Sequence, residues 1–281
     1  MIALAGYEGY KYFGNKESIK DSPINKVFNN KNSKEPKEKV PEEYKISLLA
    51  TGDGLIHSVI YRSYDKGNGV YDFTDALKLV SLRGELMENA YPTGYGLSAI
   101  SGLIEKDVSM LVGSVNRPEN PVYLANYNAA DQFVIAGTES AMQEVLDKAR
   151  EKGATKTDRL AVAVPSHCPL LADSAQKLFD AMQHVHFKRP AIAYLSGSTG
   201  RVFWQADRIA DDLAFNMARP LYWANAMTAA YERGVRLAVE MPPGSVLTGL
   251  AKRVMTDGDA VSIQQEGIHT VLKLGERLKG E

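Results

Sequence analysis

Cysteine is nearly absent from this chain of 281 residues, because Cys168 is the only one. A single cysteine forms neither an internal disulfide nor a multi-cysteine zinc site, which predicts a cytoplasmic protein in a reducing environment. Long apolar runs are also missing, and about 18 such residues are needed to cross a bilayer. The N-terminal residues lack the basic start and apolar core of a secretion signal. We therefore expect no membrane partner.

A surplus of charge of either sign is missing as well. The formal net charge is −1, with 24% charged and 44% apolar residues. These values are ordinary for globular proteins and exclude a chain that is disordered throughout. The balance also argues against nucleic-acid binding, which requires a basic surface. At roughly 100–200 residues per domain, the length allows one large domain or two small ones.

The first quarter of the chain differs in texture from the rest. Residues 15–45 are dense in Lys, Glu, Asn, Ser and Pro, and their few apolar residues keep no helical or strand period. This composition predicts a mobile or poorly packed stretch. We therefore treat residues 1–66 as an atypical N-terminal segment.

From about Gly69 onward the pattern is that of an α/β protein. Apolar spacing predicts a helix over residues 72–90. Strand, helix, strand, strand, helix and strand then follow over residues 96–103, 105–112, 122–127, 132–136, 139–152 and 159–164. This order is typical of the split ferredoxin-like unit. It predicts a four-stranded antiparallel sheet with two helices on one face, as a subdomain of residues 96–163.

A second alternation occupies the rest of the chain. Helices are predicted at residues 169–183, 206–217, 222–233 and 246–255, and short apolar strands at 191–195 and 236–240. Such alternation favours a parallel sheet that is covered on both faces. The fold class is therefore α/β, with a larger domain of residues 67–95 and 164–281 that the ferredoxin-like subdomain interrupts.

Two adjacent residues, His167 and Cys168, follow an apolar strand. Open α/β sheets place ligands and catalytic groups at the carboxyl ends of strands, so His167 is a candidate catalytic residue. A single histidine in a core or turn is the more common case. Neighbours on an extended chain point to opposite faces, so we expect Cys168 to be a small buried residue rather than a nucleophile paired with His167.

Arg83 and the turn at residues 241–245 each allow two interpretations. Arg83 either binds a carboxylate with both arms of its guanidinium or pairs on the surface with Glu85 or Glu88. The turn has the sequence MPPGS and leads from a strand into a helix. Its backbone amides either bind an anion or form a plain connector.

No G-x-S-x-G motif, which places a nucleophilic serine on a sharp strand-to-helix turn, is present. Of the two nearest sequences, the one around Ser98 lies inside a predicted strand and is expected to be structural. The other surrounds Ser58, which follows a short apolar run. Its flanking glycines are replaced by Ile56 and Ile60.

Several stretches, in this order, resemble malonyl-CoA:acyl-carrier-protein transacylases. They are VYDFTDAL at 70–77, LRGELM at 82–87, VIAG at 134–137, VPSHC at 164–168 and GSVLTGL at 244–250. Within that family, AYPTGYG at 90–96, NMARP at 216–220 and EMPPG at 240–244 are similar to the malonate decarboxylase epsilon subunit. The resemblance covers roughly three quarters of the chain.

This resemblance implies an α/β-hydrolase-like domain with an inserted ferredoxin-like subdomain. It also implies transfer of malonyl from malonyl-CoA to an acyl carrier protein through a serine ester, with no bound cofactor or metal. Other malonate decarboxylase subunits are implied as partners. By position, Ser58 matches the nucleophile, His167 the general base and Arg83 the arginine that holds the malonyl carboxylate. The backbone carbonyl of Asn216 matches the group that orients the histidine.

A second hypothesis rests on where the chain departs from this pattern. Residues 1–57 hold no counterpart of the family's Gly-Gln-Gly-Ser-Gln loop. Ile56 and Ile60 are β-branched where the turn needs glycine. The chain would then be a non-catalytic relic or assembly subunit of the same complex. On this basis we expect Ser58 to lie beyond hydrogen-bond reach of His167.

Overall fold

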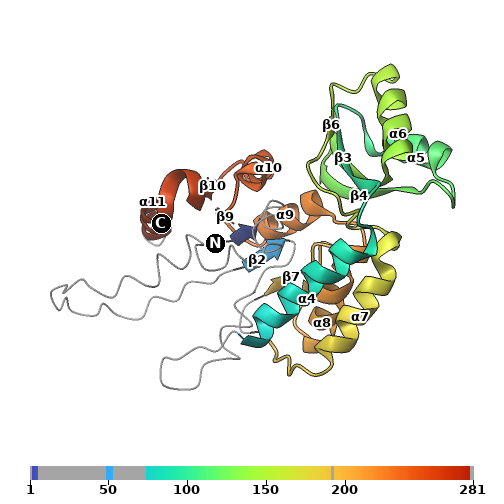
Figure 1. The fold of residues 1–281 in the computed structure, drawn as a ribbon. Coiled ribbons are helices and arrows are strands. Elements are labelled where there is room, and N and C mark those ends of the chain that lie inside the picture. The colour runs from blue at the N-terminus through green and yellow to red at the C-terminus, as the bar shows by residue number, and fades with distance from the viewer. Residues whose placement is uncertain (1, 6–48, 53–73, 191–192, 279–281) are drawn as a thin grey trace, which may run out of the picture.

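A computed structural model describes residues 2–5, 49–52, 74–190 and 193–278 (Figure 1). The stretch 15–45, for which mobility is predicted, lies outside the described residues, as does Ser58. None of the helices that the structure describes has both the length and the apolar character needed to span a membrane.

Within the residues that the structure describes, four parallel strands form the larger sheet, in the order β10-β9-β1-β2. They are β1 (Ile2–Ala5), β2 (Leu49–Gly52), β9 (Leu237–Met241) and β10 (Asp259–Ser262). The parallel pairing agrees with the alternation seen in the sequence. Two of the four strands come from residues 1–66, so this atypical segment contributes to the central sheet.

Helices cover both faces of the sheet at β9. They are α9 (Trp223–Glu232), α10 (Val246–Val254) and α11 (Ile263–Arg277). Ala238 packs in one apolar cluster with residues of α9 and α10, while Leu237 and Val239 pack in another with residues of α11. Successive strand residues point to opposite faces, which explains why β9 is apolar at every one of these positions.

Three further helices pack together beside this sheet (Figure 1). They are α4 (Thr74–Ala90), α7 (Ala172–Met182) and α8 (Ala206–Phe215), and α7 lies against both of the others. Their shared core includes Met87, Leu178 and Ala214. Short 3-10 turns, η1 (Pro169–Leu171) and η2 (Asn216–Ala218), lie at the start of α7 and the end of α8. The candidate site residues His167 and Asn216 lie next to or within these turns.

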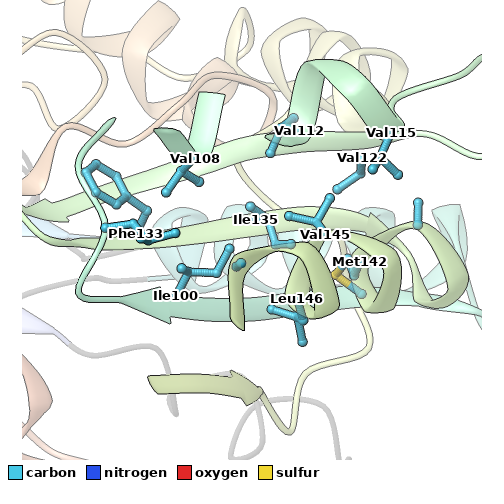
Figure 2. Close-up of a cluster of buried hydrophobic side chains, with 13 residues drawn as sticks. Ile100, Val108, Val112, Val115, Val122, Phe133, Ile135, Met142, Val145 and Leu146 are labelled. Carbon is cyan, nitrogen blue, oxygen red and sulfur yellow. The ribbon is translucent and has the colours of Figure 1, made fainter. Parts of the chain in front are cut away.

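The ferredoxin-like prediction is confirmed. The elements are β3 (Tyr95–Ser101), α5 (Glu105–Val115), β4 (Val122–Ala129), β5 (Gln132–Thr138), α6 (Glu139–Glu151) and β6 (Lys156–Arg159). The strands form an antiparallel sheet in the order β4-β5-β3-β6. Both helices pack on one face, and Figure 2 shows their valines between the helices and the strand residues Ile100, Phe133 and Ile135.

Several elements of the structure differ from the sequence-based prediction. The last strand of the small sheet is β6, which ends at Arg159, whereas residues 159–164 were the predicted strand. The strand forms at residues 156–159 because these residues pair with Ser98–Ser101 of β3, although residues 160–164 are more apolar. In the segment predicted as a strand at 191–195, Tyr194–Leu195 (β7) pairs antiparallel with Val202–Phe203 (β8) in a separate two-stranded sheet. The helix α11 was not predicted, because Gly267, with φ of +76°, and several polar residues break its period.

Candidate active site

His167 lies in the connection between β6 and η1, in an unusual backbone conformation. Its φ is +62°, in the left-handed region that residues with a Cβ seldom adopt. Its backbone N–H donates to the carbonyl of Met217 at 2.7 Å, and its side chain is fully buried. Such conformations persist where the surrounding structure holds them, and they cluster at functional sites.

The imidazole ring of His167 is oriented by Asn216. Nδ1 lies 2.8 Å from the backbone carbonyl oxygen of Asn216. A carbonyl oxygen only accepts hydrogen bonds, so Nδ1 carries the proton and the lone pair of the neutral ring is on Nε2. This tautomer is the one that a general base acting through Nε2 requires.

Asn216 also contacts Arg83 through its side chain. Nη2 of Arg83 donates to Oδ1 of Asn216 at 3.2 Å, and both residues are buried. Burial contradicts the interpretation of Arg83 as a surface residue that pairs with Glu85 or Glu88. The amide oxygen is neutral, so this hydrogen bond does not itself neutralise the guanidinium charge.

The local sequence explains how α4 and η2 present these groups. Arg83 lies four residues before Met87, so both side chains are on the buried face of α4. Asn216 opens the 3-10 turn at the end of α8, where the last helical carbonyls lack partners within the helix. Its carbonyl oxygen accepts from the backbone N–H of Arg219 at 3.3 Å within this turn, and the second lone pair is available to His167.

The structure thus brings together three of the four predicted site residues, with Asn216 in contact with both His167 and Arg83. The fourth, Ser58, lies outside the described residues together with Ile56 and Ile60. The expected separation between Ser58 and His167 therefore stays a prediction. The carbonyl of Met217, which holds the His167 backbone, was not predicted, since any residue type supplies such a group.

Cys168 is buried, as predicted, and its environment makes its thiol unreactive. It packs against Leu97, Val134 and Ala136 of the small sheet, and its Sγ donates to the carbonyl of Pro165 at 3.2 Å. Burial raises the pKa of the Cys168 thiol to about 12. A thiol with this pKa holds almost no thiolate at neutral pH, so it is a poor nucleophile.

The turn at residues 241–245 connects β9 to α10. The backbone amides at the start of α10 bind a carboxylate of the same chain, that of Glu240. The buried carboxylate of Glu240 accepts hydrogen bonds from the backbone N–H of Leu247 at 3.1 Å and of Thr248 at 2.7 Å. The Thr248 hydroxyl adds a third at 2.6 Å. Glu240 therefore already occupies the amides that open α10.

Ser98 is structural, as predicted from its place in a strand. It is fully buried in β3, and its Oγ donates to Sδ of Met142 at 3.7 Å. Among the residues that the structure describes, no three His, Cys, Asp or Glu side chains are grouped so as to hold a metal ion.

Comparison with known proteins finds the chain similar to proteins of one name. The chain is 34% identical over 197 residues to the malonyl CoA-acyl carrier protein transacylase of Haemophilus influenzae, covering 69% of this chain and 62% of that protein. It is 30% identical over 216 residues to the transacylase of that name from Bacillus subtilis, covering 76% and 68%. No family model matches the chain.

Solved structures agree with these relatives. FabD from Acinetobacter baumannii superposes with a TM-score of 0.68 at 33% identity, covering 76% of this chain and 68% of that one. A malonyl-transacylase solved in complex with the type II PKS acyl-carrier protein AntF gives a TM-score of 0.66 at 30% identity, covering 78% and 69%. The chain spans 60–62% of the length of the first curated relatives that it matches.

Proposed function

The chain belongs to the malonyl-CoA:acyl carrier protein transacylase family, and we propose that it moves a malonyl group from malonyl-CoA to the thiol of an acyl carrier protein. The fold agrees with the family's α/β-hydrolase-like core and ferredoxin-like subdomain. The proposal is carried by the two contacts of Asn216. Its backbone carbonyl orients His167, and its side chain contacts Arg83.

The first half of the reaction acylates Ser58. It requires Oγ of Ser58 to come within hydrogen-bond reach of Nε2 of His167, in contrast to the separation expected under the second hypothesis. Nε2 of His167 takes the hydroxyl proton as Oγ of Ser58 attacks the thioester carbonyl of malonyl-CoA. The tetrahedral intermediate expels the CoA thiolate, which receives the proton from Nε2. The hydrogen bond from Nδ1 to the Asn216 carbonyl keeps the ring in place while it is positively charged.

The second half runs in the opposite direction. The carrier thiol gives its proton to Nε2 of His167 and attacks the malonyl ester on Ser58. The ester breaks, and the leaving Ser58 oxygen regains the proton from His167. Malonyl is then bound to the carrier as a thioester, and the enzyme is regenerated.

Arg83 supplies selectivity for malonyl. Its planar guanidinium matches the two oxygens of the free carboxylate, which an acetyl group lacks. The bond from Nη2 to Asn216 fixes the orientation of the guanidinium plane on α4.

Incubation with radiolabelled malonyl-CoA followed by acid quench tests the proposal. We expect an acid-stable, base-labile ester on Ser58 that moves to added acyl carrier protein. Ser58→Ala should abolish the label, whereas Ser109→Ala, at an exposed position on α5, should keep it. A folded wild-type chain that takes up no label would contradict the proposal.

Within this activity, we propose the malonate decarboxylase system as the setting. The stretches at residues 90–96, 216–220 and 240–244 support it. The test offers the labelled enzyme equal amounts of a malonate decarboxylase carrier subunit and a fatty-acid acyl carrier protein. Faster transfer to the former is expected, and equal or reversed preference would favour an ordinary transacylase.

Ile56 and Ile60 favour a second candidate, an assembly subunit without catalysis. The labelling experiment separates the two candidates. Absence of label, combined with stable association with other decarboxylase subunits, would support the assembly role.

A further inference from the structure

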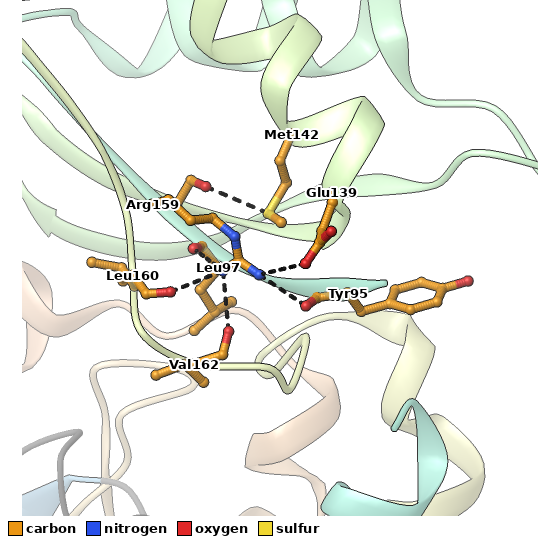
Figure 3. Close-up of polar contacts among 8 residues, drawn as sticks. Tyr95, Leu97, Glu139, Met142, Arg159, Leu160 and Val162 are labelled. Atoms are coloured by element: carbon orange, nitrogen blue, oxygen red, sulfur yellow. Dashed lines mark hydrogen bonds and ion pairs between the residues drawn. The ribbon is translucent and has the colours of Figure 1, made fainter. Parts of the chain in front are cut away.

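A single guanidinium, that of Arg159, binds four backbone carbonyl oxygens (Figure 3). Nη1 donates to Leu97 at 2.7 Å, to Leu160 at 3.0 Å and to Val162 at 3.1 Å. Nη2 donates to Tyr95 at 2.9 Å. The planar guanidinium, with its five N–H donors, can bind these carbonyl oxygens on several sides at once. A lysine ammonium, with three donors at one point, cannot.

The four carbonyls belong to the start of β3 and to the segment that follows β6, the two places where the ferredoxin-like unit joins the rest of the chain. Tyr95 and Leu97 lie where the chain arrives from α4, the helix of Arg83. Leu160 and Val162 lie where it leaves β6 toward His167. The backbone N–H of Leu160 also donates to Leu97 at 3.0 Å. Arg159 therefore ties together the connections that lead to both candidate site residues.

The two segments approach so closely because Gly96 has no side chain. A Cβ at this position would lie 2.1 Å from Nη2 of Arg159 and 2.4 Å from the carbonyl oxygen of Val162. These distances are far below van der Waals contact, and the second involves backbone. Glu139 adds a carboxylate oxygen 3.5 Å from Nη2, so the guanidinium has an acidic neighbour.

Packing extends this connection to the residues that flank His167. Leu97, Val134 and Ala136 of the small sheet pack in one cluster with Cys168, the next residue after His167. Partly buried Val162 and Leu170 belong to the same cluster. A shift of the small sheet relative to α4 would therefore move the segment that carries His167.

We propose that Arg159 is a positioning residue for malonyl transfer. It holds the start of β3 against the segment that follows β6, so that His167 keeps its contact with the Asn216 carbonyl. The inference rests on the proposed function, since it assigns Arg159 a role in the same reaction. Arg159 touches no reacting atom, so its effect is expected on kcat and not on the binding of malonyl-CoA.

Chemical rescue provides the decisive readout. The Arg159 side chain is 38% exposed and lines an open cavity of about 510 Å³, so a small cation can reach its position. We expect Arg159→Ala to lower kcat about tenfold to a hundredfold with little change in KM, since a small misplacement of catalytic groups has such an effect. Millimolar guanidinium should restore much of the rate, whereas sodium chloride at the same ionic strength should not.

Two variants serve as comparisons. Gly96→Ala should show the same loss without rescue, because its Cβ fills the place of the guanidinium. Arg150→Ala removes a nearby exposed arginine that pairs with Asp147, and it should keep the wild-type rate. If Arg159→Ala does not fold, Arg159→Lys takes its place and should retain KM and lose kcat.

A second measurement is independent of transfer. Diethylpyrocarbonate modification of His167, followed by mass spectrometry, should be slow in the wild type, because this side chain is fully buried. It should accelerate in Arg159→Ala and slow again with guanidinium. Wild-type kcat and His167 reactivity in the Arg159 variant would overturn the inference. Absence of transfer in the wild type, with the reactivity changes present, would instead contradict only the proposed function.

Discussion

The backbone carbonyl oxygen of Asn216 lies 2.8 Å from Nδ1 of His167, although the two residues are 49 positions apart in the chain. The side-chain oxygen of Asn216 serves a different residue, Arg83. The main chain of Asn216 therefore acts on the base, and its side chain acts on the arginine. Substitution at this one position separates the two contributions.

Asn216→Ala should weaken malonyl binding and spare the base. The backbone carbonyl that orients His167 remains, while Arg83 loses its acceptor at 3.2 Å. A hydrogen bond to a charged group contributes about 1.5–3 kcal/mol, so we expect KM for malonyl-CoA to rise at least about tenfold with kcat nearly unchanged. Steady-state kinetics measure both values. A collapse of kcat at unchanged KM would show that the side chain supports the base.

Arg83→Ala should reduce malonyl transfer far more than any residual acetyl transfer. Only malonyl carries a free carboxylate for the guanidinium, and loss of a charge-assisted pair costs roughly tenfold to a hundredfold in rate. The ratio of kcat/KM for malonyl-CoA and acetyl-CoA measures the effect. Arg83→Lys is the control, since it keeps the charge without the fork. Equal losses for both acyl groups would mean that Arg83 is structural.

Cys168 should be inert in the folded protein. Its side chain is buried, and its thiol pKa of about 12 suppresses the thiolate. Iodoacetamide at pH 8 should label Cys168 only after unfolding, and Cys168→Ala should retain transfer activity. Rapid labelling of the native chain would contradict this assignment.

The same thiol predicts a pH dependence of stability. Its pKa is raised in the folded state, so the folded chain keeps a proton that the unfolded chain loses near pH 8.5. The free energy of unfolding should therefore fall as the pH rises from about 8.5 toward 12. Urea titrations at several pH values should show a smaller fall for Cys168→Ala.

Asp212 should be important for stability. Its buried carboxylate accepts hydrogen bonds from the hydroxyls of Tyr194 at 2.7 Å and Ser196 at 3.0 Å. Asp212→Ala leaves both hydroxyls without this acceptor, which should lower the free energy of unfolding by about 2–5 kcal/mol. Asp212→Asn keeps one acceptor oxygen and should lose less. Equal urea midpoints for the two variants would contradict this account.

Asp212 also predicts a slope at acid pH. Burial raises its pKa despite the two hydrogen bonds, which act in the opposite direction. The unfolded chain therefore releases this proton first, near pH 3.9, so the free energy of unfolding falls as the pH rises above that value, while the hydrogen bonds to the carboxylate remain. Asp212→Asn should lack this slope, and unfolding curves between pH 3 and 7 measure the difference.

Local sequence patterns determined most of the secondary structure. The alternation and spacing over residues 95–151 predicted β3, α5, β4, β5 and α6 nearly at their observed bounds. The resemblance to the transacylase family, carried by short motifs, pointed to His167, Arg83 and Asn216 as one site. These features are local or rest on short motifs, so each is encoded within a few neighbouring residues.

Tertiary contacts decided the rest. Pairing with β3, and not apolar content, placed the last small strand at Lys156–Arg159. The Arg159 guanidinium meets Tyr95 and Leu97 more than 60 residues away, and its contacts are backbone carbonyls that every residue type carries. The tautomer of His167 likewise depends on a carbonyl of η2. Every residue type has the same main-chain carbonyl, so a sequence does not reveal which carbonyl will bind a given side chain. These contacts, and the positions of the site residues that depend on them, are determined only when the chain has folded.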